Sequence, residues 1–511
     1  MRNSPLTTSI HILDDDSLLN VFHLYRPFLL GEDDDDEDDR LIGGSQGWVR
    51  GRWWYKLAHV CQRWRNVLLG SAAYLGVSLV CTIGTPVADI LAHSPPLPLL
   101  IDYTHYDEIT SEDEEGAILA LKQYDRVRRV RLFMPPTSLQ KFIPTMDEEY
   151  PILEHLIIAH LLEDKTTMLT LPETLQAPHL RHLTLFGFAL PIRSRLLTNA
   201  VGLVTLILVM VNPSTYFHPN TLLQWLSFMP QLETLMISFY FPDRSRHVGG
   251  QFMHTAITTL VTLPNLRLFR FKGVTAYLEA IIRRISAPRL ERLGITFFNQ
   301  LTFSVPRLLH FVGTTENLRF KTARFKFSNE MVDVEAYPHE EADTYALSII
   351  VNCCHLDWQV SSVAQIFNAL SPVISAVEQL TFEHEVHGQS SEEHNEVNPI
   401  EWRKLLGSFR NVKTLRIATG LVKELSLCLQ SEDGELPLEL LPELQELTYF
   451  GSADSGNQFT SFINARLDVG RPITLTRRSP SPDSSSRASS LQVELSSIIP
   501  ASAEAGSDLD T

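Results

Sequence analysis

A serine and a group of histidines have the types and spacing that catalysis or metal binding would need. Ser45 lies in residues 43–47 (GGSQG), which match the nucleophile elbow of hydrolases. That motif requires a strand before it and a helix after it, whereas eight consecutive acidic residues precede it here. We therefore predict no catalytic residue and no enzymatic activity. A hydrolase centred on Ser45 is the competing hypothesis, and an esterase assay with Ser45→Ala tests it.

Metal binding is the second chemistry to consider. His384, His387 and His394 cluster with four glutamates, but such spacing sets no coordination geometry, so we predict a solvated loop and no metal site. Cys353 and Cys354 follow an apolar stretch and are predicted to be small core residues. The five cysteines are too few and too scattered for a disulfide framework. We also predict that the protein binds no cofactor.

Composition and charge describe a large acidic globular chain. The 511 residues are 44% hydrophobic and carry a net charge of -17, which disfavours nucleic acid as the main partner. The first ten residues contain no apolar stretch of the kind that signal peptides have. The longest apolar run, residues 200–211, is shorter than the roughly 20 residues that span a bilayer. We expect a cytoplasmic or nuclear protein that binds no membrane.

A repeated pattern begins near residue 97 and would supply the scaffold. It consists of an apolar residue, two mostly polar residues, and then two apolar residues separated by a variable one. Successive copies begin 23 to 34 residues apart as far as Leu290. The next gap, 87 residues to Val377, divides into three steps of 29, and weaker strands at 320–327 and 347–351 fall near those steps. The copies start at Val127, Leu153, Leu180, Leu203, Leu232, Leu266, Leu290, Val377, Val412 and Leu444.

This period predicts an α/β solenoid, with one short parallel strand and one returning helix in each repeat. Positions one, four and six of the pattern are expected to enter a shared core. The pattern resembles the leucine-rich repeat family, although the asparagine or cysteine of that family is missing from most copies. The resemblance implies an irregular horseshoe, and we expect insertions near 241–251, 330–341 and 384–399. The exposed positions mix both signs: Arg128, Arg129, Glu154, Arg181, Glu233, Glu291, Lys413 and Gln445.

Two amphipathic segments precede the repeats. Residues 10–25 contain Asp14, Asp15 and Asp16, which suit a helix N-terminus. The apolar positions of this segment are Ile12, Leu13, Leu18, Leu19 and Phe22. In residues 53–79 apolar side chains recur at spacings of three and four, which predicts a helix with a bulky apolar stripe. Residues 32–39 (EDDDDEDD) lie between the segments and predict a solvated spacer, or alternatively an acidic bait for a basic partner.

The two segments resemble an F-box, and the similarity is greatest to F-box proteins of mushroom-forming fungi. Leu57, the pair Val60-Cys61 and the pair Trp64-Arg65 fit the second helix of that family, whereas Asp14 replaces the proline that follows the leucine of the first helix. The resemblance implies that a helical patch binds the Skp-type adaptor of a cullin-based ubiquitin ligase. Its residues would be Leu13, Leu18, Leu19, Phe22, Leu57, Val60, Cys61 and Trp64.

Together these features predict the substrate-recognition adaptor of an SCF-type ubiquitin ligase, whose solenoid binds an unknown protein substrate. The alternative is a repeat scaffold for protein recognition without ligase coupling, favoured by Asp14 and the long acidic insert. The predicted domains are an F-box-like helical domain at 1–80 with its insert at 31–47, a linker or cap at 81–98, the solenoid at 99–475, and a disordered Ser/Arg/acidic tail at 476–511.

Overall fold

The computed structural model divides the chain into two compact units, Met1–Leu203 and Val204–Thr511. The acidic insert with Ser45, the insertion at 241–251, His387, His394 and the tail from residue 479 lie outside the described residues. The structure describes residues 13–25, 52–104, 109–160, 169–211, 217–240, 259–298, 300, 302–384, 398–430, 440–451 and 456–478.

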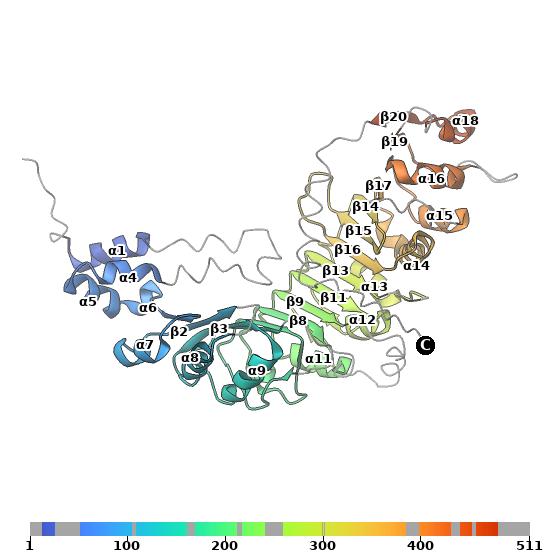
Figure 1. Ribbon diagram of the computed structural model, residues 1–511. Coiled ribbons are helices and arrows are strands. Elements are labelled where there is room, and N and C mark those ends of the chain that lie inside the picture. Colours follow the sequence, from blue (N-terminus) through green and yellow to red (C-terminus); the bar gives the residue numbers. More distant parts are fainter. Residues whose placement is uncertain are drawn as a thin grey trace, which may run out of the picture. The chain divides into compact units, whose positions relative to one another are not determined.

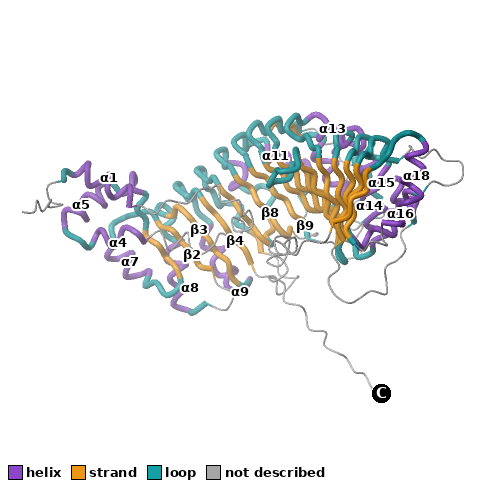
Figure 2. The backbone as a smooth tube through the Cα atoms, turned by 90° about the horizontal axis from the view of Figure 1, so that it is seen from above, coloured by secondary structure: helices purple, strands orange, loops and turns teal. Residues whose placement is uncertain are grey.

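The main sheet of the first unit is parallel, and its strands follow one another in chain order (Figure 1). Helices return the chain between strands and lie along one face of the sheet (Figure 2). The strands are β1 (Leu79–Thr82), β2 (Leu99–Thr104), β3 (Val127–Met134), β4 (His155–His160) and β6 (His182–Phe186), with β5 (Leu169–Thr170) and β7 (Phe188–Ala189) forming a small parallel pair. The returns are α7 (Val87–His93), α8 (Ser111–Leu121), α9 (Pro136–Phe142), η3 (Ile143–Met146) and α10 (Arg195–Asn199).

The repeat pattern explains these strands. Each predicted copy in this unit begins at its strand or two residues before it, and the apolar positions four and six are buried against the helices. Before each strand the backbone N–H of Glu154 or Arg181 donates to a carbonyl of the preceding repeat, which extends the ladder beyond the strands. The buried side chains are Val130, Leu132, Leu156, Ile158, Leu183 and Leu185.

The sheet begins earlier than the sequence predicted. Leu79 pairs with Leu99, so β1 crosses the predicted boundary at residue 80, and the stretch from Leu99 is the second strand. The predicted linker at 81–98 contains α7. The predicted boundary at residue 80 divides the run LVCT of β1 between the helical domain and the linker, because a brief apolar run does not distinguish a helix from a strand.

Among the described residues, a helical cluster at the start of the first unit contains four short helices: α1 (Asp15–Tyr25), α4 (Trp53–Ala58), α5 (Gln62–Gly70) and α6 (Ala72–Leu75). The prediction of one helix through residues 57–68 is wrong, because α4 ends before His59 and Cys61 has extended backbone (φ -162°, ψ 168°). Asp14 caps α1 as predicted, since its carboxylate accepts from the backbone N–H of Ser17 at 2.7 Å. The Trp54 indole donates to the carbonyl of Ser78 at 3.0 Å and so joins the cluster to the flank of β1.

The second unit continues the same architecture. One eleven-strand sheet carries its helices on one side (Figures 1 and 2). In spatial order its strands are β8 (Thr205–Val211), β9 (Thr234–Phe239), β11 (Leu268–Gly273), β13 (Arg292–Phe297), β16 (Leu347–Asn352), β15 (Met331–Tyr337), β14 (Thr322–Phe327), β17 (Gln379–His384), β18 (Thr414–Ile417), β19 (Glu446–Phe450) and β20 (Thr474–Arg478). A small parallel pair joins β10 (Val261–Thr262) to β12 (Ile285–Ser286).

The returns of this unit include helices within 219–226, 275–282 and 399–406, in agreement with the predicted returning helix of each repeat. Several start with proline at the first helical position, where the missing N–H costs no intrahelical hydrogen bond. The helices are α11 (Pro219–Leu226), α12 (Thr275–Ile282), α13 (Pro306–Thr314), α14 (Leu356–Ile374), α15 (Pro399–Leu406), η6 (Thr419–Leu421), α16 (Val422–Leu429), η7 (Asn457–Phe459) and α18 (Thr460–Asp468).

Three strands of the second unit break the order of the chain. Strands β14 and β16 occupy the two weak strands predicted for the 87-residue gap, but β16 pairs with β13, whereas β14 pairs with β17. Strand β15 lies between them and is antiparallel to both. The prediction of three equal steps in chain order is therefore wrong. The insertion expected at 330–341 is mostly this extra strand, and Ser328 closes its turn by accepting from the N–H of Met331.

Helix α14 carries the chain from β16 to β17 and so restores the regular strand order. After β16 the chain must cross β15 and β14 to reach β17, which is about 14 Å at ordinary strand spacing. The 19 residues of α14 span about 28 Å, more than the crossing requires. The long helix thus replaces the short return of an ordinary repeat.

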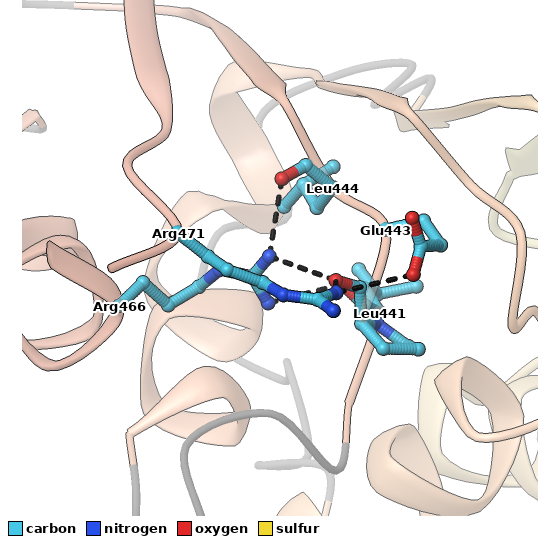
Figure 3. Close-up of polar contacts among 6 residues, drawn as sticks. Leu441, Glu443, Leu444, Arg466 and Arg471 are labelled. Atoms are coloured by element: carbon cyan, nitrogen blue, oxygen red, sulfur yellow. Dashed lines mark hydrogen bonds and ion pairs between the residues drawn. The ribbon is translucent and has the colours of Figure 1, made fainter. Parts of the chain in front are cut away.

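The last repeat is held by arginines rather than by apolar contacts alone. Arg466 in α18 is fully buried and donates to the carbonyls of Leu441, Pro442 and Leu444, each at 3.1 Å (Figure 3). Arg471 donates to the Glu443 carboxylate at 3.1 Å. These bonds satisfy carbonyls of an irregular segment that precedes β19, in which Leu441 has a positive φ of 47°. Strand β20 extends to Arg478, beyond the predicted end of the solenoid at 475.

Among the described residues no helix combines the length and the apolar character that a membrane crossing requires.

Candidate binding surface

The sheet face opposite the helices is the candidate binding surface, and we call it the open face. In each unit the register places residues of successive strands in rows across it. In the first unit one row contains Leu100, Arg129, His155 and His182. No described helix of this unit packs on that side (Figure 1). The side chains of this row are therefore partly exposed and do not belong to the core.

A pair of histidines occupies the middle of that row. The rings of His155 and His182 stack with centroids 4.3 Å apart and an interplanar angle of 8°. Burial, followed by the positive charge of Arg129, lowers the pKa of His155 to about 2, so this ring is neutral at physiological pH. Because the His155 ring is neutral, it stacks on the His182 ring next to arginines without adding a positive charge.

The arginines of the first unit's open face have acidic neighbours. Arg128 forms an ion pair with Glu154 at 2.9 Å. Arg131 and Asp102 are register partners on adjacent strands and are both buried. Burial raises the pKa of Asp102, whereas the positive charge of Arg131 opposes that rise. Arg128 and Arg131 thus each have an acidic neighbour within the unit.

The open face of the second unit contains a group of cations that we call the cationic strip: Arg270 and Lys272 on β11 and Arg292 on β13. Arg270 and Lys272 alternate with the buried residues of β11, and Arg292 is on the adjacent strand. The five adjacent strands β8, β9, β11, β13 and β16 contain no aspartate or glutamate. This is unusual in a chain with a net charge of -17.

The position of Arg270 depends on a glycine. Gly294 is its register partner on β13, and a Cβ at that position would lie 3.2 Å from the Arg270 Cγ. The side chain extends over this glycine, and its guanidinium donates to the hydroxyl of Tyr345 at 3.0 Å. Glycine at 294 thus allows Arg270 to lie flat along the sheet.

Lys272 differs from the other cations in its surroundings. It is half-buried between Ser238 and Thr296, its register partners on β9 and β13. Burial alone lowers the pKa of its ammonium group. The described residues contain no hydrogen bond or ion pair of this side chain, and Glu233 and Glu291 lie outside β9 and β13, just before their first residues.

Further along the same face the charges occur in pairs, and we call this region the paired strip (β14, β15, β17 and β18). Lys326 pairs with Glu335 at 2.8 Å, and the Tyr337 hydroxyl donates to the same carboxylate at 2.7 Å. The other pairs are Arg324 with Glu383 at 3.4 Å and Arg416 with Glu340 at 2.8 Å. Hydrogen bonds from Gln379 and Arg416 lower the pKa of Glu340.

Four of the eight residues predicted to bind an adaptor are in the core of the helical cluster. Leu18 and Phe22 are fully buried, Leu57 and Trp64 are nearly so, and the Phe22 and Trp64 rings meet edge-on at 5.0 Å. These four cannot form a surface patch in this conformation, which corrects their predicted placement. The periodic stripe faces the cluster itself because a short helix in isolation must bury its apolar side.

The other four predicted residues remain accessible. Leu13 is 36% exposed and Val60 is 56% exposed, whereas Leu19 and Cys61 are partly exposed. Arg63 donates to the carbonyl of Leu13 at 2.6 Å, which brings Leu13 to the end of the cluster where Val60 and Cys61 lie. The sequence analysis did not single out other exposed apolar side chains of the cluster, which are Val21, Leu24, Tyr25 and Tyr74.

Of the residues considered for chemistry, the structure describes Cys353, Cys354 and His384. Cys353 is buried as predicted, and burial raises its thiol pKa to about 12, but Cys354 is exposed and the prediction of a core residue is wrong there. His384 ends β17. Within the described ranges no cluster of three or more His, Cys, Asp or Glu side chains has the arrangement of a metal site.

Comparisons with known proteins do not identify a family. No family model matches the chain, and no curated protein matches it. Among solved structures the chain is similar to a chain in the crystal structure of a TLR13–ssRNA13 complex, with a TM-score of 0.30 and 11% identity. That match covers 79% of this chain and 50% of the other, so this chain spans half of the neighbour's length. A similarity of this degree supports no argument about function, and the assignment of a solenoid rests on the strand order and the returning helices.

Proposed function

We propose that the chain is a recognition scaffold without enzymatic activity, whose open face binds a protein ligand. The observation that supports this most is the open face of the second unit, where polar and charged side chains of successive strands lie in rows and no described helix packs on them. Such a surface holds a ligand by many moderate contacts and needs no catalytic group. On this proposal the open face contributes to function by holding a ligand in position.

The helical cluster would attach this scaffold to a Skp-type adaptor and, through it, to a cullin-based ubiquitin ligase. The F-box resemblance of residues 57–65 supports this role, as do the exposed apolar side chains of Leu13 and Val60 at one end of the cluster. Exposed apolar groups next to one another are the usual anchors of protein interfaces. On this proposal the patch is stabilised by the buried residues beneath it, which are Leu18, Phe22, Leu57 and Trp64.

A scaffold without ligase coupling is the second candidate. Asp14, at the place of the family's proline, caps α1, and the cluster keeps half of the predicted contact residues in its own core. Both features favour a helical cluster whose role is to cover the end of the sheet beside β1, where Trp54 already bonds to Ser78. The two candidates share the open face and differ only in the adaptor.

Co-purification with a Skp-type adaptor separates the candidates. The informative change is Val60→Asp, which places a charge in the exposed patch without entering the core. Leu427→Asp is the matched control, because Leu427 is 47% exposed on helix α16 of the second unit. We expect the wild type and the control to retain the adaptor and Val60→Asp to lose it. Equal retention by all three proteins, or by none, would favour the uncoupled scaffold. Trp64→Ala is a poor test because it would unfold the cluster.

A photo-crosslinking amino acid at two positions tests the open face. Placed at Thr296 on β13, it should crosslink to bound proteins, and placed at Leu427 on the helix side it should give few crosslinks. More crosslinks at Leu427 than at Thr296 would show that ligands bind the helix side and would contradict the proposal.

A further inference from the structure

The last strand of the second unit leaves one edge of its sheet without a described neighbour (Figure 1). Strand β20 pairs with β19 on one side, and no described strand pairs with its other side. The backbone N–H of Thr474 donates to the carbonyl of Gln445 at 2.9 Å. Because the backbone groups of a strand point to alternate sides, the N–H and C=O of Leu475 and Arg477 point away from β19. These outward groups are a template for one more strand.

The exposure of Leu475 shows the same gap on the helix side of the sheet. Leu475 continues a register row that runs through Leu380, Leu415 and Leu447 on the preceding strands. Those three leucines are fully buried and have a strand on both sides, whereas Leu475 is 36% exposed. Within the described residues the last repeat therefore lacks the cover that a following repeat gives to the one before it.

The first unit has a cover at its first strand. The helical cluster lies beside β1, where the Trp54 indole donates to the carbonyl of Ser78 at 3.0 Å. Repeat folds need a cap at each end, because a terminal repeat otherwise exposes its apolar side and its backbone edge. The described residues of the second unit contain no equivalent strand beyond β20.

Residues 491–495 (LQVEL) have the sequence of a short strand with one buried face. Apolar and polar residues alternate in this segment, and a period of two is typical of such a strand. The segment has the same length as β20. It lies outside the described residues, within the predicted disordered tail. The serine-rich composition that predicts disorder is concentrated in residues 479–490, which precede the segment.

The connection favours an antiparallel arrangement of this segment with β20. Residues 479–490 join the two and include Pro480 and Pro482. A parallel strand needs a crossover, which is usually a helix, and a stretch rich in proline and serine disfavours a helix. An antiparallel strand needs only a loop. So short a connection also keeps the segment at a high effective concentration near β20, which favours it over a strand of another molecule.

We propose that residues 491–495 add to the free edge of β20 as an antiparallel strand and so cap the second unit. The three apolar side chains of the segment cover Leu475 on the helix side of the sheet. Its backbone pairs with the outward N–H and C=O groups of Leu475 and Arg477. This inference concerns the edge of the sheet and does not depend on what the open face binds.

Hydrogen–deuterium exchange tests the proposal, read by mass spectrometry on peptides that contain Leu475 and Arg477. The outward amides of these two residues face no described strand, so an added strand protects them. We expect a chain truncated after Ser490 to exchange these amides at least about tenfold faster than the full chain does. Strand β19 is the internal reference, because β18 and β20 pair with its two sides, and its exchange should change little.

Two proline variants locate the strand within the tail. Val493→Pro removes a backbone donor from the middle of the segment and should expose the amides of Leu475 and Arg477 as fully as the truncation does. Ser485→Pro is the matched control, because it makes the same change in the connection, and it should exchange like the full chain. Unfolding midpoints verify that both variants fold.

Three results would overturn the proposal. In the first, the outward amides of β20 exchange equally fast in the full chain, the truncated chain and Val493→Pro, which would mean that the edge stays free. In the second, Ser485→Pro loses as much protection as Val493→Pro, so that residues 491–495 are not the strand. In the third, protection falls on dilution of the full chain, so that a second copy supplies the strand.

Discussion

The cationic strip and the paired strip lie on the same sheet face and contain similar cations, but the strands around Lys272 of the cationic strip contain no acid, whereas Lys326 of the paired strip has Glu335. In the paired strip Glu335 accepts from Lys326 and Tyr337, and Glu340 pairs with Arg416. Both glutamates come from the extra strand β15 or the residues just after it. The insertion thus neutralises Lys326 and Arg416, whereas Lys272 forms no ion pair with the described residues.

The difference indicates two uses of charge in one fold. In the paired strip an ion pair with low exposure (23% and 14% for Lys326 and Glu335) helps to hold an antiparallel strand inside a parallel sheet. In the cationic strip burial disfavours the charge of Lys272, and no ion pair with a described residue offsets that cost. Four predictions test this contrast.

The largest effect is expected for Glu335→Gln in the paired strip. The change leaves Lys326 without its anion and weakens the bond from Tyr337, so the free energy of unfolding should fall by about 2 kcal/mol. Urea unfolding measures it. The control is Glu443→Gln, whose pair with Arg471 is half-exposed on both sides and should cost less than about 0.5 kcal/mol. Similar losses in both variants would mean that Glu335 has no special structural role.

An effect of opposite sign is expected for Lys272→Met in the cationic strip. Methionine retains the apolar stem and removes the uncompensated charge, so the unfolding free energy should rise by up to about 1 kcal/mol. The same change at Lys326 should lower it, because Glu335 would lose its cation. Destabilisation by both changes would abolish the distinction between the two strips.

The pH dependence of Lys272 gives the third prediction. Because burial lowers its pKa in the folded protein, the unfolded chain binds this proton more strongly, and stability rises with pH towards the ordinary lysine value of about 10.4. The gain of Lys272→Met over the wild type should therefore shrink as pH is raised from neutral towards that value. Unfolding midpoints of the two proteins, measured in parallel, show the trend. A gain that is constant with pH would contradict it.

The smallest effect is expected for Arg324→Gln. Its pair with Glu383 is long, at 3.4 Å, and both side chains are more than one-third exposed. The change should alter stability by less than about 0.5 kcal/mol. A larger loss, measured in the same urea series, would show that exposure does not decide which pairs of the paired strip matter.

Local pattern predicted much of this fold. Every strong copy of the repeat is a strand, and the returns within 219–226, 275–282 and 399–406 are helices, because apolar period and proline position act within one repeat. The order of β16, β15 and β14 could not be predicted. The pattern identifies a strand but does not specify its neighbour, and the residues of β15 alternate like any half-buried strand.

The candidate sites were predicted less well, for a related reason. The stripe through Leu57, Trp64 and Leu68 is a correct signal of burial, but the sequence does not say whether the buried side meets a partner or a neighbouring helix. The break at Cys61, which exposes Val60, follows from packing of two short helices. The exposed strand positions contain charged side chains of both signs, and this mixture did not indicate the cationic strip. Which charges pair depends on which strands are neighbours in the sheet.

The amino-acid sequence alone determined that this chain forms repeated strand–helix units with an acidic overall charge, since hydrophobic period and composition are local properties. Tertiary structure decided which strands meet, and therefore which charges cancel: Lys326 faces Glu335 only because β15 is inserted beside β14. It also decided that Lys272 has no such counterpart. Charge compensation depends on distances across strands, and those distances exist only once the sheet has formed.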